Sequence, residues 1–342
     1  MGSVVQRVRE SIAILGAGAW GTALSAHLAR NPGSPRLKLW SRSAAHAREM
    51  AATRENARYL PGIPLSPKID IGTDLDEAVS DATIIVVATP IGALLDLVAQ
   101  LRGSSAIPLV WLGKGFVATR DPPGVGLAHR ELARQWRAPV GVVSGPSFAE
   151  EVARGLPTAV SVAASEAALA DKLGRLLRGE ALRAYVSDDL TGVEVGGAVK
   201  NVLAIAAGAS DGLGFGTNAR AALITRGLAE TGRLSAALGG KRETLMGLSG
   251  LGDLVLTCTG DLSRNRRVGL ELAKGRPLEA ILAGLGHVAE GVDAARATRL
   301  LCSALSVDMP ICAAVYGVLY EKLPPKRAVE GLLAREPGPE FQ

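Results

Sequence analysis

The stretch Ser11-Ile-Ala-Ile-Leu-Gly-Ala-Gly-Ala-Trp-Gly21 decides the fold class of this chain. Its first five residues form an apolar run that predicts a buried strand, and a helical pattern follows it. Gly16, Gly18 and Gly21 have the G-x-G-x-x-G spacing of a strand–turn–helix unit that binds the pyrophosphate of a dinucleotide. The first glycine allows the tight turn, the second the approach of the phosphates, and the third the close packing of helix on strand. A glycine-rich turn without a ligand is the weaker alternative, because a turn alone does not need three glycines at this spacing.

Apolar runs alternate with helical patterns through the first half of the chain. This alternation predicts a mostly parallel sheet with helices on both faces. The expected strands are Ser11–Leu15, Leu37–Trp40, Ala82–Ala88, Pro108–Leu112, Val140–Val143, Thr158–Ala163 and Leu182–Val186, and helices are expected at Trp20–Arg30, Ala44–Glu55 and from Pro90 to Leu101.

The strand signals stop after Ser187, and the chain then has a helical pattern to about Arg335. We therefore expect an α/β protein with two domains. A Rossmann-like dinucleotide-binding domain would cover residues 1–187, and an all-helical substrate domain would cover residues 188–335. The Pro- and Gly-containing tail, residues 336–342, is expected to be disordered.

The overall composition excludes some functional classes. The chain has 342 residues, of which 48% are hydrophobic and 21% charged, as in ordinary soluble globular proteins. A net charge of +5 comes without a long Lys/Arg run and with only 4% aromatic residues, so we expect no nucleic-acid partner. The basic balance fits an anionic small molecule equally well. No uninterrupted apolar stretch is long enough to span a membrane, so no stable membrane insertion is expected.

Cysteine usage indicates a reducing compartment. Cys258, Cys302 and Cys312 are odd in number and widely spaced, and no pair has the spacing of metal ligands or of a C-x-x-C motif. We expect reduced, mostly buried thiols, no metal site and a cytoplasmic location. The first residues show no signal peptide or myristoylation pattern. The four histidines have no metal or triad spacing, and we assign them no chemistry.

The end of the second predicted strand, Trp40-Ser-Arg-Ser43, bears on the choice of dinucleotide. An NAD site usually has Asp or Glu here, which binds the ribose hydroxyls. This segment has no carboxylate, and Arg42 can bind a 2′-phosphate instead. NADP(H) is therefore favoured and NAD(H) is possible. The alternative is that Arg42 is simply a solvated surface residue.

A lysine lies within the apolar stretch Val195–Gly208, which reads VGGAVKNVLAIAAG. On a helix, Lys200 shares a face with Gly196 and Gly197, a turn without side-chain bulk that would leave room for a ligand. Asn201 is one position round and can bind the same ligand. This placement indicates an acid/base lysine, whose pKa burial can lower towards roughly 7–8. The alternative is a lysine that snorkels at a domain junction.

Other polar segments have both a functional and a structural interpretation. Ser263-Arg-Asn-Arg-Arg267 resembles a capped helix start with N–H and guanidinium donors for a phosphate, or a solvated basic helix start. Ser147-Phe-Ala-Glu150 fits a capping box, which alone could explain its serine. Asp253 follows Gly252 and could be a turn residue. Lys114 follows a predicted strand and could be an exposed turn residue.

Five segments that occur in order give a specific resemblance. Together they closely resemble the bacterial-type NAD(P)-dependent sn-glycerol-3-phosphate dehydrogenases, from about Ile12 to Leu333. The resemblance implies reversible hydride transfer between NAD(P)H and C2 of dihydroxyacetone phosphate, which gives sn-glycerol 3-phosphate, the glycerol backbone of phospholipids. The segments are Gly16-Ala-Gly-Ala-Trp-Gly-Thr-Ala-Leu24, Ser144-Gly-Pro-Ser-Phe-Ala149, Gly196-Gly-Ala-Val-Lys-Asn201, Gly250-Leu-Gly-Asp-Leu-Val-Leu-Thr-Cys-Thr259 and Ser263-Arg-Asn-Arg-Arg267.

The resemblance also implies roles for single residues. Lys200 matches the proton donor and acceptor, Asp253 the carboxylate beside it, and Lys114 a lysine that touches both ligands. Together with Asn201 from the helix projection, the expected substrate contacts are Lys114, Gly145, Ser147, Lys200, Asn201, Asp253, Ser263, Arg264 and Asn265. The expected cofactor contacts are Gly16, Gly18, Ala19, Trp20, Gly21, Arg42, Lys114, Ala149, Arg264, Val288 and Glu290, of which Ala19, Trp20 and Arg42 are carried over by position only.

Two other functions remain as alternatives. A related dehydrogenase for a 3-hydroxy acid or 6-phosphogluconate would share the fold and a helical lysine near glycines. The Ser-Arg-Asn-Arg-Arg run and the Gly-Leu-Gly-Asp segment favour a phosphorylated triose instead. A non-catalytic NADPH sensor would keep the glycine loop but would have no reason to keep Lys200, Asp253 and Arg264 together. A homodimer is a possible assembly.

Overall fold

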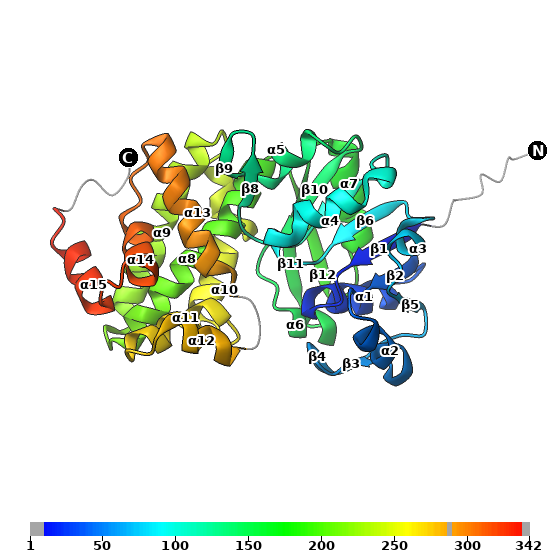
Figure 1. The fold of residues 1–342 in the computed structure, drawn as a ribbon, viewed down its shortest axis with the longest axis horizontal. Coiled ribbons are helices and arrows are strands. Elements are labelled where there is room, and N and C mark those ends of the chain that lie inside the picture. The colour runs from blue at the N-terminus through cyan, green and yellow to red at the C-terminus, as the bar shows by residue number, and fades with distance from the viewer. Residues whose placement is uncertain (1–9, 286–288, 337–342) are drawn as a thin grey trace, which may run out of the picture.

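The computed structural model describes residues 10–285 and 289–336. Figure 1 shows a sheet covered by helices in one half of the molecule and a group of packed helices in the other. The eight-stranded sheet has the order β12-β11-β10-β7-β6-β1-β2-β5, and only the β10–β11 pair is antiparallel among its neighbours. Its strands are β1 (Ser11–Leu15), β2 (Arg36–Trp40), β5 (Ile69–Gly72), β6 (Ile84–Val87), β7 (Leu109–Trp111), β10 (Val140–Ser144), β11 (Thr158–Ala164) and β12 (Leu182–Ser187).

The central strand β1 buries both of its faces, as expected for a parallel strand between two helical layers. Ile12 and Ile14 belong to the core on one face, and Ala13 and Leu15 to the core on the other. The first core includes residues of α1 (Ala19–Arg30), α2 (Ala44–Thr53), α6 (Ala149–Arg154) and α7 (Ala167–Leu177), and the second residues of α3 (Leu75–Val79), α4 (Leu94–Gln100) and α5 (Ala128–Ala133).

The predicted Rossmann-like fold is confirmed, with strand boundaries that differ by one or two residues. The edge strand β5 was not predicted, because Ile69-Asp-Ile-Gly72 is short and carries a charge. Two small antiparallel pairs were also missed, because a two-stranded ribbon buries too little apolar surface to show a clear pattern. They are β3 (Glu55–Asn56) with β4 (Leu60–Pro64), and β8 (Val117–Arg120) with β9 (Pro123–Gly126).

The second half of the chain is helical, as predicted. Its longest helix, α8 (Leu190–Gly212), is buried along most of its length, and the other helices of this half pack against it or against one another (Figure 1). They are α9 (Gly216–Ala237), α10 (Asp253–Thr259), α11 (Arg264–Ala273), α12 (Leu278–Leu285), α13 (Glu290–Leu305), α14 (Pro310–Tyr320) and α15 (Pro325–Leu333), with the 3₁₀-helix η3 (Glu243–Met246) and the π-helix η4 (Leu248–Gly252).

Helix α8 is long and apolar, but it lies inside the protein. Among the described helices, it is the one whose length and apolar composition would suffice to cross a bilayer, but 83% of its apolar window is buried inside the protein. The three cysteines are free and buried, as expected. The predicted disordered tail lies outside the described residues except for Glu336.

Two glycines bring α8 and α11 into unusually close contact. A Cβ atom at Gly208 would lie 1.9 Å from the carbonyl oxygen of Arg266, and one at Gly269 would lie 2.0 Å from that of Ile205. Each helix therefore presents a glycine to the backbone of the other, and no side chain fits between them. The contact fixes the start of α11, which carries Ser263 and Arg264, against the helix that carries Lys200.

We expect Gly269→Ala to destabilise the protein, because the new methyl group must force α8 and α11 apart. Overpacking of this kind costs about 1–3 kcal/mol. Chemical denaturation followed by circular dichroism measures the loss. Gly284→Ala is the matched control: Gly284 is also helical, and a Cβ there would meet nothing within 4 Å. Equal unfolding free energies for the two variants would contradict the role of the glycine contact.

Candidate active site

The glycine loop between β1 and α1 has the geometry that a pyrophosphate requires. Gly16 has φ +122°, and a Cβ there would lie 2.9 Å from the backbone of Ala88. A Cβ at Gly21 would lie 2.0 Å from the carbonyl oxygen of Gly16, so helix and turn pack directly. At Gly18 nothing lies within 4 Å, and the N-terminus of α1 has no side-chain cap. The free space and the uncapped N–H groups fit a dinucleotide phosphate.

Two further predicted cofactor contacts, Trp20 and Arg42, lie at the start of α1 and after β2. The Trp20 indole nitrogen, at the start of α1, donates to the carbonyl oxygen of Ser147 at 2.9 Å. Arg42 is exposed between β2 and α2, and Ser43 caps α2 by accepting from the backbone N–H of His46 at 3.3 Å. Arg42 therefore lies in the short segment between the end of β2 and the N-terminus of α2, and this segment has no carboxylate.

Asn56, which was not predicted from the sequence, stabilises the glycine loop through side-chain hydrogen bonds. Its side-chain nitrogen donates to the carbonyl oxygen of Ala17 at 3.0 Å and to Thr22 Oγ1 at 2.7 Å. Its oxygen bonds the ring of His46 at 2.9 Å and accepts from the backbone N–H of Tyr59 at 3.2 Å. Asn56 lies on the unpredicted strand β3 and far along the chain from Ala17, so no local pattern pointed to it.

The buried lysine, Lys200, lies in an ion cluster with Asp253 and Lys114. Its ammonium donates to Asp253 Oδ1 at 2.6 Å and to Thr257 Oγ1 at 2.9 Å. Lys114 donates to Asp253 Oδ2 at 2.6 Å and to the carbonyl oxygen of Gly145 at 3.1 Å. The side chains of Lys200 and Asp253 are only 9% and 1% exposed. One carboxylate therefore holds two ammonium groups; the sequence interpretation had assigned it only one.

Burial and neighbouring charges set the protonation of this cluster. Burial lowers the pKa of Lys200 to about 8; the Asp253 carboxylate opposes this shift and the Lys114 ammonium adds to it. Burial alone would raise the pKa of Asp253, but the charges of Lys114 and Lys200 hold it below its usual value. Lys200 can therefore exchange a proton near neutral pH while Asp253 stays ionised.

The two glycines on the face of Lys200 have a different role from the expected one. A Cβ at Gly196 would lie 2.6 Å from the carbonyl oxygen of Ser249, and one at Gly197 would lie 2.9 Å from Ser144 Oγ. The expected room for a ligand over this turn is thus occupied by the protein. The glycines instead let η4 and the end of β10 approach α8, which brings Asp253 close to Lys200.

The start of α11 is built as predicted. Ser263 is its N-cap and accepts from the backbone N–H of Arg266 at 3.2 Å. Arg264 is exposed. Asn265 is buried; its nitrogen donates to Asn201 Oδ1 at 2.9 Å, and its oxygen accepts from the N–H of Gly291 at 3.0 Å. The buried amide nitrogen of Asn201 has no hydrogen-bond partner among the described residues.

Two further predicted residues, Ser147 and Ala149, lie between the end of β10 and the first turn of α6. The capping-box interpretation of Ser147 is wrong: Phe148 is the N-cap of α6, and Ser147 Oγ donates to the carbonyl oxygen of Gly145 at 2.9 Å, because the chain turns at Gly145. Ala149 begins α6 directly after it.

Glu290, at the start of α13, adds a second carboxyl group to the ion cluster of Lys200, Asp253 and Lys114. Burial raises the pKa of its carboxyl group, and the charges of Arg264, Lys114 and Lys200 oppose that shift, together with a hydrogen bond from the Lys114 backbone. Glu290 therefore lies within electrostatic reach of three other predicted residues, Arg264, Lys114 and Lys200. Val288 lies outside the described residues.

Comparison with known proteins assigns the chain to a family. Residues 11–170 match the model of the NAD-dependent glycerol-3-phosphate dehydrogenase N-terminus, and residues 189–330 match that of the C-terminus. The chain is 54% identical over 336 residues to a glycerol-3-phosphate dehydrogenase [NAD(P)+] of Ralstonia nicotianae, with 95% of this chain and 97% of the relative covered. A relative of the same name in Cupriavidus necator is 52% identical over 335 residues, with 95% and 98% covered.

Solved structures agree with this assignment. The crystal structure of glycerol-3-phosphate dehydrogenase from Coxiella burnetii superposes with a TM-score of 0.90 at 42% identity and covers 96% of this chain and 99% of that one. The yeast glycerol-3-phosphate dehydrogenase superposes with a TM-score of 0.82 at 26% identity, with 94% and 99% covered. The chain, with its glycine loop and its buried lysine cluster, therefore belongs to the NAD-dependent glycerol-3-phosphate dehydrogenase family.

Proposed function

We propose that this enzyme interconverts dihydroxyacetone phosphate and sn-glycerol 3-phosphate with NAD(P)H, and that Lys200 is its general acid and base. The observation that carries the proposal is the 2.6 Å contact between the buried Lys200 ammonium and Asp253 Oδ1, beside Lys114. Reduction of a ketone needs a proton donor at the oxygen, and a lysine with a pKa of about 8 can both give and take that proton.

The remaining residues of the site bind and orient the reactants. When bound, the nicotinamide supplies the hydride to C2 of the ketone. Lys200 protonates the C2 oxygen and removes that proton in the reverse direction, and Asp253 holds its ammonium in place. Arg264 and the capped N-terminus of α11 offer donors to the phosphate dianion. The unpartnered amide nitrogen of Asn201 supports a contact with substrate.

The dinucleotide preference is also part of the proposal. The exposed Arg42 beside the N-terminus of α2, in a segment without a carboxylate, favours NADPH over NADH. Gly16, Gly18 and Gly21 would hold the pyrophosphate, with Ala19, Trp20 and Ala149 nearby on α1 and α6.

We also propose that the domain boundary lies between residues 187 and 188. The start of α8 at Leu190, and the gap between the two family matches at residues 170 and 189, support this division. We assign the enzyme to the cytoplasm, where its three free thiols would stay reduced.

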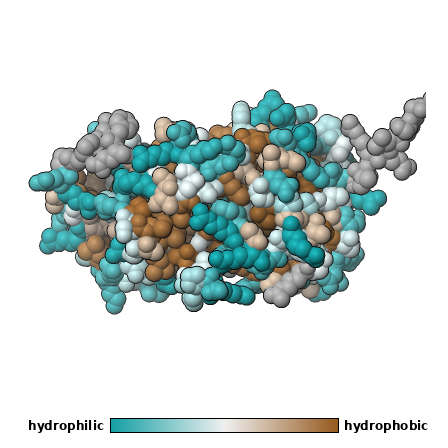
Figure 2. Space-filling view, turned by 90° about the horizontal axis from the view of Figure 1, so that it is seen from above, coloured by the Kyte–Doolittle hydropathy of each residue, from teal (hydrophilic) through white to brown (hydrophobic). Residues whose placement is uncertain are grey.

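A homodimer is the assembly that we propose. Figure 2 shows apolar surface between the polar side chains of the helical half, and Leu300, Leu305 and Leu333 are among its exposed large side chains. Multi-angle light scattering would test this assembly, and the mass of a single chain at micromolar concentration would contradict it.

Arg42→Ala should raise the apparent KM for NADPH and leave that for NADH nearly unchanged, because only NADPH carries the 2′-phosphate. Steady-state kinetics with both cofactors measure the two values. The same change in KM for both cofactors would show that Arg42 does not distinguish them.

Asp253→Asn should shift the alkaline limb of the pH–rate profile to lower pH. The carboxylate raises the pKa of Lys200, so its loss lets burial and the Lys114 charge push that pKa below about 8. The protonated donor that ketone reduction needs is then lost at lower pH. The measurement is kcat/KM for dihydroxyacetone phosphate between pH 6 and 10, on a variant whose melting curve shows that it is folded. An unmoved or upward-shifted limb would contradict the assignment.

Lys200→Arg tests the general acid itself. Arginine keeps the positive charge but is effectively never deprotonated, so kcat should fall by roughly 10²–10⁴-fold. NADPH affinity, measured by fluorescence titration, should barely change, because the glycine loop holds the pyrophosphate. Lys241→Arg is the matched control, since Lys241 forms an exposed ion pair with Asp188. Turnover near that of the wild type in a folded Lys200→Arg variant would overturn the proposal.

A further inference from the structure

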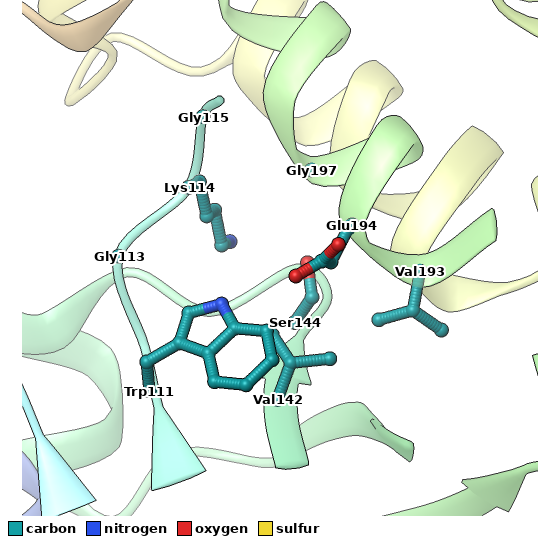
Figure 3. A pocket seen from close by; sticks show the side chains of 9 residues that line it. All are labelled: Trp111, Gly113, Lys114, Gly115, Val142, Ser144, Val193, Glu194 and Gly197. Carbon is teal, nitrogen blue, oxygen red and sulfur yellow. The ribbon is translucent and has the colours of Figure 1, made fainter. Parts of the chain in front are cut away.

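A small cavity lies behind Lys114, between the ends of β7 and β10 and the first turns of α8. Its volume is about 10 Å³, enough for roughly one water molecule. Figure 3 shows the side chains that point toward this space. It is lined by Trp111, Gly113, Lys114, Gly115, Val142, Ser144, Val193, Glu194 and Gly197.

Polar groups converge on this cavity from three elements. Ser144 Oγ is buried and has no hydrogen-bond partner among the described residues. The Glu194 carboxylate, the Lys114 ammonium and the Trp111 indole nitrogen point toward the same space (Figure 3). A buried water needs two to four polar partners, and this set offers both donors and acceptors. The cavity therefore has the size and the polar lining that one ordered water requires.

The cavity lies between two sets of hydrogen-bonded side chains. On one side, Lys114 donates to Asp253 Oδ2, whose other oxygen accepts from Lys200. On the other side, Glu194 accepts from His129, through its backbone N–H at 3.1 Å and its ring Nδ1 at 2.8 Å. The Glu194 side chain is 3% exposed, but that of His129 is 20% exposed. His129 thus connects the buried carboxylate to solvent.

We propose that this water, Glu194 and His129 form a proton route between solvent and the catalytic lysine cluster. The inference rests on the proposed role of Lys200. During ketone reduction, Lys200 gives one proton to the substrate oxygen and becomes a neutral amine. Asp253, which is ionised at rest, then transiently takes a proton from Lys114 on Oδ2, turns about its Cβ–Cγ bond and passes the proton to Lys200. Lys114 regains a proton from the water, the water from Glu194, Glu194 from His129 and His129 from solvent, so the net change is one proton taken up.

The route serves a donor that solvent reaches poorly. The Lys200 side chain is only 9% exposed before any ligand binds, and the ligands themselves must lie on its open side to react. The cavity lies on the side of Lys114 that faces Glu194, so a proton can arrive while substrate and cofactor are in place.

The charges around Glu194 suit it to carry a proton. Burial raises the pKa of its carboxyl group, and His129 and Arg130 on α5 oppose that shift. Lys114 faces it across the cavity (Figure 3). Asp253, Lys200 and Glu290 lie beyond Lys114. Burial therefore favours the neutral form of this carboxyl group, which can receive a proton from the His129 ring and pass it on.

Three variants test the route in the complete enzyme. Asparagine at position 129 can still donate to Glu194 but cannot relay a proton, so His129→Asn should lower kcat by about tenfold, below the range typical of a direct proton donor. Glu194→Gln should have a similar effect. Imidazole added to His129→Ala should restore turnover in a concentration-dependent way, and the loss in both His129 variants should grow with pH. A crystal structure of the wild type should show one ordered water on Ser144 Oγ and Glu194.

Glu230→Gln is the matched control for an altered buried carboxylate. Glu230 accepts hydrogen bonds from the backbone N–H groups of Ile311 and Cys312, but it lies on α9 and does not line the cavity. Its variant should lose stability and keep the pH profile of turnover. Wild-type kcat and pH profile in His129→Asn and Glu194→Gln would overturn the route, as would a fall in kcat that imidazole does not restore. If Lys200 were not the general acid, the Lys200→Arg variant would stay active. This result would distinguish a failure of the proposed function from a failure of the proton route.

Discussion

The site depends on one carboxylate, that of Asp253, which the buried Lys200 ammonium and the partly buried Lys114 ammonium share. Lys114 comes from the sheet domain and Lys200 from α8, and both donate to Asp253 at 2.6 Å. Removing one partner of such a cluster leaves an uncompensated buried charge, which is strongly destabilising. The cluster therefore constrains the relative placement of the sheet and the helices, and the packing glycines of α8 serve that constraint.

Much of the fold and part of the site could be predicted from the sequence. The glycine spacing, the strand–helix alternation and the N-cap at Ser263 are local patterns, so they identified a Rossmann-like domain, a helical domain and the start of α11. Lys200 was found because a lysine among apolar helical residues is conspicuous. Its contact with Asp253 rested on the family resemblance, and the structure contains that contact.

The missed features all join segments that are far apart along the chain. Asn56 supports the glycine loop from a two-residue strand, and His129 reaches Glu194 from a separate helix. The room expected over Gly196 and Gly197 was wrong because η4 packs there, which depends on the path of the chain after α9. Periodicity describes one element at a time, so it cannot show which backbone will approach a glycine from elsewhere.

The glycine contact between α8 and α11 has a consequence for selectivity. It fixes the distance between Lys200 on one helix and the donors at the start of the other, since neither backbone can slide past the other without a clash at Gly208 or Gly269. The pair of helices therefore holds these groups at one fixed distance. On the proposed assignment, in which Lys200 protonates the carbonyl oxygen and the start of α11 binds the phosphate, these two groups of a substrate must be separated by the matching number of bonds. A longer or shorter phosphorylated ketone would place one of its two ends out of register.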